Sequence, residues 1–303
     1  MNSAIAILTF RRLPAIQEAM RGLVQHCSKY PIGIFEDCGQ TDGTEAWLIK
    51  EAVDCEDVPE LMAKKYTKTH LGPNVEVYLG DTNLGVTGNS NRCLRWFMLQ
   101  ENCDHLCLLN DDLHVLGNFV DFYAKGHAEL GVGLFCFCDF TKASPAISGP
   151  PETYRWLTVR SRGYQVKLLP RMTGIMMSMT RSLVERIGYY DPRFAKFGEE
   201  HTDYTIRARL AGFVSLDGQP QNCLDLEHKL LRHQDIASSI QGHDREQADQ
   251  EAASIMGEIC KRYGQEPLYR PFRLRQPKMV GGHAGLGIPF EHLGGYALED
   301  LTL

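Results

Sequence analysis

The sequence lacks long apolar runs, an excess of basic charge and the paired cysteines of zinc sites. Its 303 residues include 32 Lys and Arg against 38 Asp and Glu, and the net charge of −6 disfavours a generally basic surface for nucleic acids. No window approaches the roughly 18 consecutive apolar residues that a membrane-spanning helix needs. The ten cysteines are scattered through apolar segments, as is typical of buried free thiols in a reducing compartment. We therefore expect a cytoplasmic protein without a membrane span.

Two glycine-rich motifs are also absent after the first predicted strand, Ala4–Thr9. No GxGxxG follows this strand, which argues against a dinucleotide-binding oxidoreductase. The next residues, Thr9–Pro14, contain no glycine at all, which disfavours a sugar-phosphate nucleotidyltransferase. The start of the chain does not resemble a signal peptide either, because Arg11 and Arg12 follow the apolar run instead of preceding it.

Short apolar runs alternate with helix-period segments through the first half of the chain, which predicts a mostly parallel sheet covered by helices. Residues 139–170 are rich in Ser, Pro, Gly and Arg without firm periodicity, so we expect loops or an acceptor-side insertion there. A helix is predicted from about Glu200 to Gly212, and an apolar stripe predicts another at Ala248–Tyr263. The expected strands are Ala4–Thr9, Ile32–Glu36, Val75–Leu79, His105–Leu109, Gly133–Cys138 and Ile175–Met179.

Acidic residues follow two of the predicted strands. Asp37 comes directly after Ile32–Glu36, and Asp111 and Asp112 come just after His105–Leu109. In an open α/β sheet, ligands bind beyond the carboxyl ends of the strands. Adjacent carboxylates repel one another unless a cation neutralises them, and hard oxygen ligands suit Mg²⁺ or Mn²⁺. The pattern indicates a metal site, with a solvated acidic turn as the competing interpretation.

Five segments with related spacing stand out along the chain. They are Ile34–Thr44 (IFEDCGQTDGT), Asn83–Asn91 (NLGVTGNSN), Leu108–Asp112 (LLNDD), Gly188–Phe194 (GYYDPRF) and Glu200–Phe213 (EHTDYTIRARLAGF). In the same order, they resemble the VVDDGSTDGT, NLGFAGGNN, LLNNDV, GGFDERF and EDVDLCLRLRRAGY motifs of family 2 glycosyltransferases. The first match needs one extra residue near Cys38. Each match is weak alone, whereas the five in order are specific.

The resemblance covers roughly residues 4 to 215 and implies a GT-A fold, which is a mixed, mostly parallel sheet flanked by helices. We expect a GT-A domain at 1–230, with a nucleotide-binding half at about 1–115 and an acceptor half at about 116–230. Residues 231–303 would form a C-terminal helix and tail.

The resemblance also implies a set of donor-binding residues. In the family pattern, the residues after strand one lie near the nucleotide, the acidic residue after strand two lies beside the base, and the middle residue of the metal motif lies beside the donor sugar. Carried over to this sequence, the set is Thr9, Arg11, Asp37, Asn83, Asn91 and Asp111.

A Mn²⁺ or Mg²⁺ ion is implied at the third of the five motifs. Asp112 matches the metal-binding Asp, while Asn110 stands where the family has its first Asp and is a departure that bears on coordination. GT-A enzymes often take a further ligand from a histidine near the end of the domain. His228 is favoured by position, and His233 is the alternative.

The catalytic base is implied within the fifth motif, where inverting enzymes of the family use a carboxylate to take a proton from the acceptor hydroxyl. The aligned position holds His201, so three interpretations stay open: His201 itself, the neighbouring Glu199 or Glu200, or Asp203. We favour Glu200. Acidic residues here could also serve only to stabilise the start of a helix.

The sequence therefore predicts a glycosyltransferase that moves a sugar from a nucleotide-sugar donor to an acceptor hydroxyl, with inversion favoured and retention compatible with the same residues. UDP-sugars are the commonest donors of the family, and dTDP- and GDP-sugars also occur. A glycan, a lipid-linked sugar, a protein or a modified nucleobase would fit as acceptor. The alternatives are a non-catalytic nucleotide-sugar-binding module on the same fold, or a nucleotidyltransferase.

Overall fold

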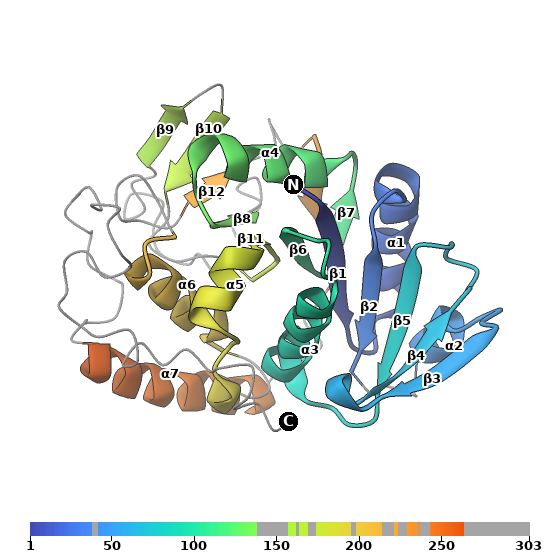
Figure 1. Ribbon diagram of the computed structural model, residues 1–303. Helices are drawn as coiled ribbons and strands as arrows, with labels where there is room; N and C mark the ends of the chain where they lie inside the picture. Colours follow the sequence, from blue (N-terminus) through green and yellow to red (C-terminus); the bar gives the residue numbers. More distant parts are fainter. Residues whose placement is uncertain are drawn as a thin grey trace.

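A computed structural model describes ten segments of the chain and places them around one large sheet. The sheet has 11 strands in the order β3-β4-β5-β2-β1-β6-β11-β8-β12-β10-β9, with helices on both faces (Figure 1). This confirms the predicted mixed sheet flanked by helices. The described residues are 1–37, 42–137, 157–161, 164–168, 174–194, 198–213, 221–223, 229–234, 236 and 243–263.

The sheet is parallel at its centre. Because these central strands are buried on both faces, their sequences are nearly unbroken apolar runs. Parallel neighbours end at the same edge of a sheet, so the loops after β1, β2 and β6 lie together there. In sheet order the parallel strands are β5 (Val75–Gly80), β2 (Ile32–Glu36), β1 (Ser3–Thr9) and β6 (His105–Asn110).

Two apolar clusters, one on each face, hold the helices against the sheet. Alternate residues of β1 divide between them: Ile5 and Ile7 belong to one cluster, and Ala4 and Ala6 to the other. The first cluster includes α1 (Leu13–Cys27), α2 (Thr44–Leu48) and α4 (Phe119–Leu130). The second includes α3 (Gly85–Leu99), α5 (Arg181–Ile187) and α6 (Glu200–Leu210).

The second half of the described chain continues the same sheet. β11 (Met176–Thr180) runs antiparallel to β6, so the two predicted halves share a hydrogen-bonded seam. Beyond it lie β8 (Leu134–Phe137), β12 (Gln221–Cys223), β10 (Tyr164–Leu168) and β9 (Leu157–Ser161). A separate small sheet pairs β7 (Leu113–Val115) with β13 (Leu231–His233).

The last described helix, α7 (His243–Tyr263), lies along α6 and the short helix η4 (Pro192–Phe194) (Figure 1). The approach is close at Gly198, where a Cβ atom would be 2.3 Å from the Cβ of Ala252. A side chain there would push α7 away. Within the described segments, no helix combines the length and the apolar composition needed to cross a membrane.

Seven of the described strands are not among the six expected ones: β7, β12 and β13, with three residues each, and four longer strands. β3 (Asp54–Val58) and β4 (Ala63–Thr67), joined by η1 (Pro59–Leu61), form an edge hairpin that was not predicted. β3 is almost wholly exposed, so it lacks the alternating apolar residues by which a strand is recognised. β9 and β10 fall inside 139–170, where only loops or an insertion were expected.

Candidate active site

Two carboxylates, Asp111 and Asp112, form the turn between β6 and β7. Asp111 is buried, and its Oδ2 accepts a 2.7 Å hydrogen bond from the hydroxyl of Thr9 at the end of β1. Arg12, directly before α1, donates from Nη1 to Asp111 Oδ1 at 2.8 Å, and the same nitrogen lies 3.4 Å from Asp112 Oδ2. The structure therefore brings three predicted residues, Thr9, Asp111 and Asp112, together at the carboxyl edge of the sheet.

The two neighbouring carboxyls differ in how easily they ionise. Burial raises the pKa of Asp111 to about 7, although the positive charge of Arg12 opposes the rise. Burial also disfavours the charged form of Asp112, but the hydrogen bond to His233 and the charges of His233 and Arg12 outweigh it and lower the pKa. Asp112 is thus the more fully ionised member of the pair at neutral pH and the better metal ligand.

The chain returns to this turn about 120 residues later, through β13. His233, the last residue of β13, places its Nε2 3.4 Å from Asp112 Oδ2. The next residue, Gln234, is buried, and its backbone N–H donates to the carbonyl of Asp112 at 2.7 Å. The side-chain Nε2 of Gln234 lies 3.2, 3.3 and 2.9 Å from the carbonyl oxygens of Ala15, Asp111 and Leu113. The Gln234 side chain thereby holds α1, the turn at Asp111 and Asp112 (the acidic turn) and β7 together.

The groups around Asp112 fit a divalent metal ion. Among the described residues, Asp112 Oδ1 has no hydrogen-bond partner although it is buried, and an imidazole nitrogen of His233 faces the other carboxylate oxygen. Carboxylate oxygens suit Mg²⁺ and Mn²⁺, and imidazole suits transition metals. The described part of the chain holds no group of three His, Cys, Asp or Glu residues that could bind a metal alone. Such a site would leave positions for phosphate oxygens and water.

The remaining residues of the predicted metal set are placed differently. Asn110 is the last residue of β6, and its backbone N–H donates to the carbonyl of Ile175 at 3.0 Å. His228 lies outside the described residues. The alternative histidine, His233, is the one beside Asp112.

Asp37, predicted to lie beside the nucleotide base, is hydrogen-bonded to protein groups. Its carboxylate accepts from the backbone N–H groups of Leu84 at 3.0 Å and Gly85 at 2.7 Å. It also forms a buried ion pair with Nη1 of Arg92 at 2.8 Å. These bonds hold the loop that enters α3 against the end of β2.

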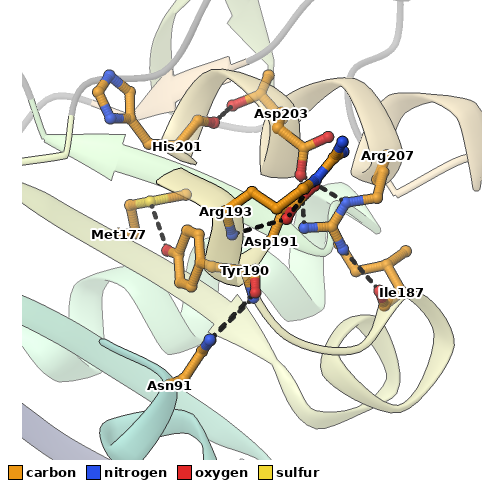
Figure 2. Close-up of polar contacts among 10 residues, drawn as sticks. Asn91, Met177, Ile187, Tyr190, Asp191, Arg193, His201, Asp203 and Arg207 are labelled. Carbon is orange, nitrogen blue, oxygen red and sulfur yellow. Dashed lines mark hydrogen bonds and ion pairs between the residues drawn. The ribbon is translucent and has the colours of Figure 1, made fainter. Parts of the chain in front are cut away.

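Asn83 and Asn91 belong to the same supporting structure. The side-chain oxygen of Asn83 accepts from the N–H of Gly85 at 2.9 Å. The buried amide of Asn91 donates to the carbonyl of Tyr190 at 3.0 Å and accepts from its N–H at 2.9 Å (Figure 2). Asn91 therefore joins α3 to the segment that leads into α6.

Glu36 and Arg12 lie at strand ends beside assigned residues, and sequence reasoning missed both as parts of the site. Glu36, the last residue of β2, is 1% exposed, and burial raises its pKa to about 8. Its Oε1 accepts weakly from the N–H of Arg11 at 3.4 Å, while Oε2 has no partner among the described residues. Arg11 itself has a left-handed backbone with φ of 51°, and its guanidinium lies 4.9 Å from the centre of the Phe10 ring. The only signal was position: Arg12 lies between β1 and α1, and Glu36 lies at the end of β2.

The start of α6 is linked to the end of β6 through residues 174 and 175. Glu200 is buried, its Oε1 is 3.3 Å from Nδ1 of His201, and its Oε2 has no hydrogen-bond partner in the described part of the chain. The ring of His201 packs on Gly174, where a Cβ atom would lie 3.4 Å from Nδ1. The next residue, Ile175, accepts the hydrogen bond from Asn110. This contact chain joins the predicted base region to the end of β6.

Asp203 is held in a buried ion pair. Its Oδ2 accepts from Nε of Arg207 at 2.8 Å, and the two side chains are 2% and 1% exposed. Arg207 also donates from Nη1 to the carbonyl of Ile187 at 2.7 Å. Figure 2 shows His201 pointing away from this pair. The geometry thus separates Asp203, which is held in an ion pair, from Glu200 and His201, whose side chains contact each other.

No protein-family model matches this sequence, and no curated protein matches it significantly. Solved structures do resemble it. S. aureus TarS aligns with a TM-score of 0.53 and 14% identity over 86% of this chain and 40% of TarS. TarS residues 1–349 in complex with UDP-GlcNAc align at 0.52 and 14% over 86% and 67%. GalNAc-T7 with UDP, GalNAc and Mn²⁺ aligns at 0.50 and 13% over 74% and 42%.

The chain has a GT-A fold. At these identities the likeness concerns the fold alone, and the chain spans less than half the length of TarS and GalNAc-T7. Within this GT-A fold, the acidic turn follows β6, and the segment with Glu200 opens α6.

Proposed function

We propose that the protein is a glycosyltransferase that moves a sugar from a nucleotide-sugar donor to an acceptor hydroxyl, with inversion at the anomeric carbon. The observation that supports this most is that Oδ1 of Asp112 is buried and has no hydrogen-bond partner among the described residues. Asp112 also lies beside His233 and next to Asp111, which is hydrogen-bonded to Thr9. The solved TarS and GalNAc-T7 structures hold UDP-GlcNAc and UDP with Mn²⁺, which makes a UDP-sugar the first donor to test.

In this proposal Asp112 and His233 hold a Mn²⁺ or Mg²⁺ ion, which neutralises the charge of the diphosphate when bound. Asp111 lies beside the donor sugar, with its orientation fixed by Thr9. Arg11 lies near the nucleotide. Asp37, Asn83 and Asn91 contribute by holding the loop and helix beside the carboxyl edge of the sheet.

Glu200 is the proposed general base, because its Oε2 is buried and has no partner among the described residues, whereas Asp203 is bound to Arg207. The proton of the acceptor hydroxyl passes to Glu200 as the hydroxyl oxygen bonds to the anomeric carbon. The bond from that carbon to the phosphate oxygen breaks, and the nucleoside diphosphate leaves with the electron pair. His201 orients Glu200 and is the alternative base.

The test is nucleotide release from UDP-, dTDP-, GDP- and CMP-sugars, with Mn²⁺ and with EDTA. We expect release from one donor that needs the metal and is lost in Asp112→Asn. Asp121→Asn on α4 is the matched control, because Asp121 is a surface carboxylate with its side chain 59% exposed. Absence of release from every donor, in a folded sample that shows no thermal shift with nucleotide and Mn²⁺, would contradict the proposal.

Two other functions would use the same fold. A nucleotide-sugar-binding module would show metal-dependent binding without release in any acceptor mixture. A sugar-phosphate nucleotidyltransferase would instead release pyrophosphate from a nucleoside triphosphate and a sugar phosphate. Glu200 favours transfer over binding alone, because its Oε2 is buried and has no hydrogen-bond partner among the described residues.

A further inference from the structure

Arg12 lies across the two carboxylates of the acidic turn with most of its hydrogen-bonding capacity unused. Its Nη1 serves both Asp111 Oδ1 at 2.8 Å and Asp112 Oδ2 at 3.4 Å. The side chain is 13% exposed, and its Nε and Nη2 are buried with no partner among the described residues. A guanidinium carries five N–H donors in a planar fork. Buried donors without partners are costly, so these atoms point to a ligand with several acceptor oxygens.

The backbone holds Arg12 firmly in this position. Arg11, the residue before it, has a left-handed backbone with φ of 51°, which is a strained conformation for a residue other than glycine. After Arg12 the chain enters α1, where the N–H of Leu13 donates to Asp42 Oδ2 at 3.0 Å and the carbonyl of Arg12 accepts from Ile16 at 3.0 Å. The guanidinium is therefore presented from a fixed point beside the acidic turn.

A metal ion at Asp112 and the Arg12 side chain would share one carboxylate group. Nη1 already occupies Asp112 Oδ2, the oxygen that also faces His233. A divalent cation beside Oδ1 would add two positive charges next to the guanidinium, and like charges at such range repel. A diphosphate would remove this conflict, because its oxygens attract both the metal and the guanidinium fork.

We propose that Arg12 is the counter-ion of the acidic turn in the free protein and becomes a ligand of the donor diphosphate when nucleotide and metal bind. This inference rests on the proposed function and deepens it. Arg12 opposes metal binding without nucleotide and strengthens nucleotide binding once the metal is present. Arg12 thus couples the two binding events, so that the metal and the donor each increase the affinity of the protein for the other.

Two affinities of the full chain test this, compared between wild type and Arg12→Met. Mn²⁺ binding without nucleotide is read from the loss of free-ion signal in electron paramagnetic resonance. UDP binding at saturating Mn²⁺ is read by calorimetry, with GDP and dTDP in parallel. We expect Arg12→Met to bind Mn²⁺ about tenfold more tightly and UDP about tenfold more weakly. Arg21→Met, with the same charge change on an exposed part of α1, should match wild type in both.

The opposite signs are decisive, because a merely structural role would weaken both affinities together. Unchanged or weaker Mn²⁺ binding in Arg12→Met, with wild type binding Mn²⁺ and UDP normally, overturns the inference and leaves the proposed function standing. Wild type that binds neither Mn²⁺ nor any of the nucleotides overturns both. Should Arg12→Met fail to fold, Arg12→Lys keeps the charge without the fork. It should retain wild-type Mn²⁺ affinity and lose UDP affinity, and the reverse result would overturn the inference.

Discussion

Buried charged side chains differ in how they are paired at two places: the carboxyl edge of β1, β2 and β6, and the surroundings of α6. At the strand edge, Glu36, Asp112 and Arg12 each keep buried polar atoms that have no partner among the described residues. Around α6, Asp203 and Arg207 neutralise each other inside the protein. Both regions lie on one sheet and contain similar residue types.

The difference shows where the protein holds charge for a ligand. An unsatisfied buried polar group costs about 1–3 kcal/mol, so three such residues at one edge are expensive unless a ligand completes them. Around α6 the paired charges support the structure. Among the acidic side chains there, Glu200 is the exception, since its Oε2 has no partner in the described segments, and it is the residue proposed as the base.

The largest expected effect is on Glu200, the acidic exception within the α6 region. Glu200→Gln keeps the shape of the side chain but cannot accept a proton, so sugar transfer should fall by about 10²–10⁴-fold. Affinity for UDP with Mn²⁺ should be unchanged, because the strand edge is intact. Transfer rates and calorimetry on the same sample check this, and a variant that turns over normally would move the role to His201.

Breaking the paired charges should affect stability. Asp203→Asn removes the carboxylate that pairs with the buried Arg207, which should lower the free energy of unfolding by about 3–5 kcal/mol. The double variant Asp203→Asn with Arg207→Met should recover part of the loss, since it removes both charges. Urea denaturation measures these differences. A loss below about 1 kcal/mol, the range of exposed pairs, would contradict the assigned role.

Glu36 should make stability depend on pH. Burial holds its pKa at about 8, above the ordinary 4.5, so the folded protein keeps a proton that the unfolded chain loses. This contribution to stability is fully present below pH 4.5 and is lost as the pH rises through 8. Glu36→Gln removes the dependence, so its advantage over wild type should grow between pH 5 and 8 to on the order of a few kcal/mol.

Urea unfolding of wild type and Glu36→Gln at several pH values provides the measurement. Burial lowers the pKa values of His105 and His127, so these groups destabilise the fold as the pH falls below 6.5. Because both proteins contain them, their effect cancels in the difference. A difference between variant and wild type that is constant with pH would show that Glu36 is ionised in the folded protein.

The smallest expected effect is at Thr9, whose hydroxyl makes one 2.7 Å hydrogen bond to Asp111. Thr9→Val removes this bond while Arg12 still contacts Asp111. We expect UDP affinity at saturating Mn²⁺ to fall by about 5- to 15-fold, or about 1–1.5 kcal/mol. Calorimetry measures the loss, and a variant that binds UDP as wild type does would remove Thr9 from the donor site.

The central fold and the acidic turn could be predicted because their signals are local. The apolar runs of β1 and β6 identify buried strands, and strand ends define the binding edge whatever follows. The edge hairpin of β3 and β4 could not be predicted, because an exposed strand carries no apolar alternation. A strand can be recognised in a sequence when its alternate side chains are buried and therefore apolar.

The return of the chain to the acidic turn was only partly predictable. A histidine ligand near the end of the domain was expected, with His228 favoured over His233. The choice depends on β13 pairing with β7, a long-range contact between two three-residue strands. The role of Gln234 has no local signal at all, because its partners come from α1, the turn and β7.

The most direct test of the central claim is an anomalous difference map at the manganese absorption edge, from crystals of the protein grown with Mn²⁺ and UDP. We predict a peak within coordination distance of Asp112 Oδ1 and His233 Nε2, with diphosphate oxygens completing the ligands. A peak elsewhere, or ordered UDP with no peak at Asp112, would contradict the assignment of the donor and metal site.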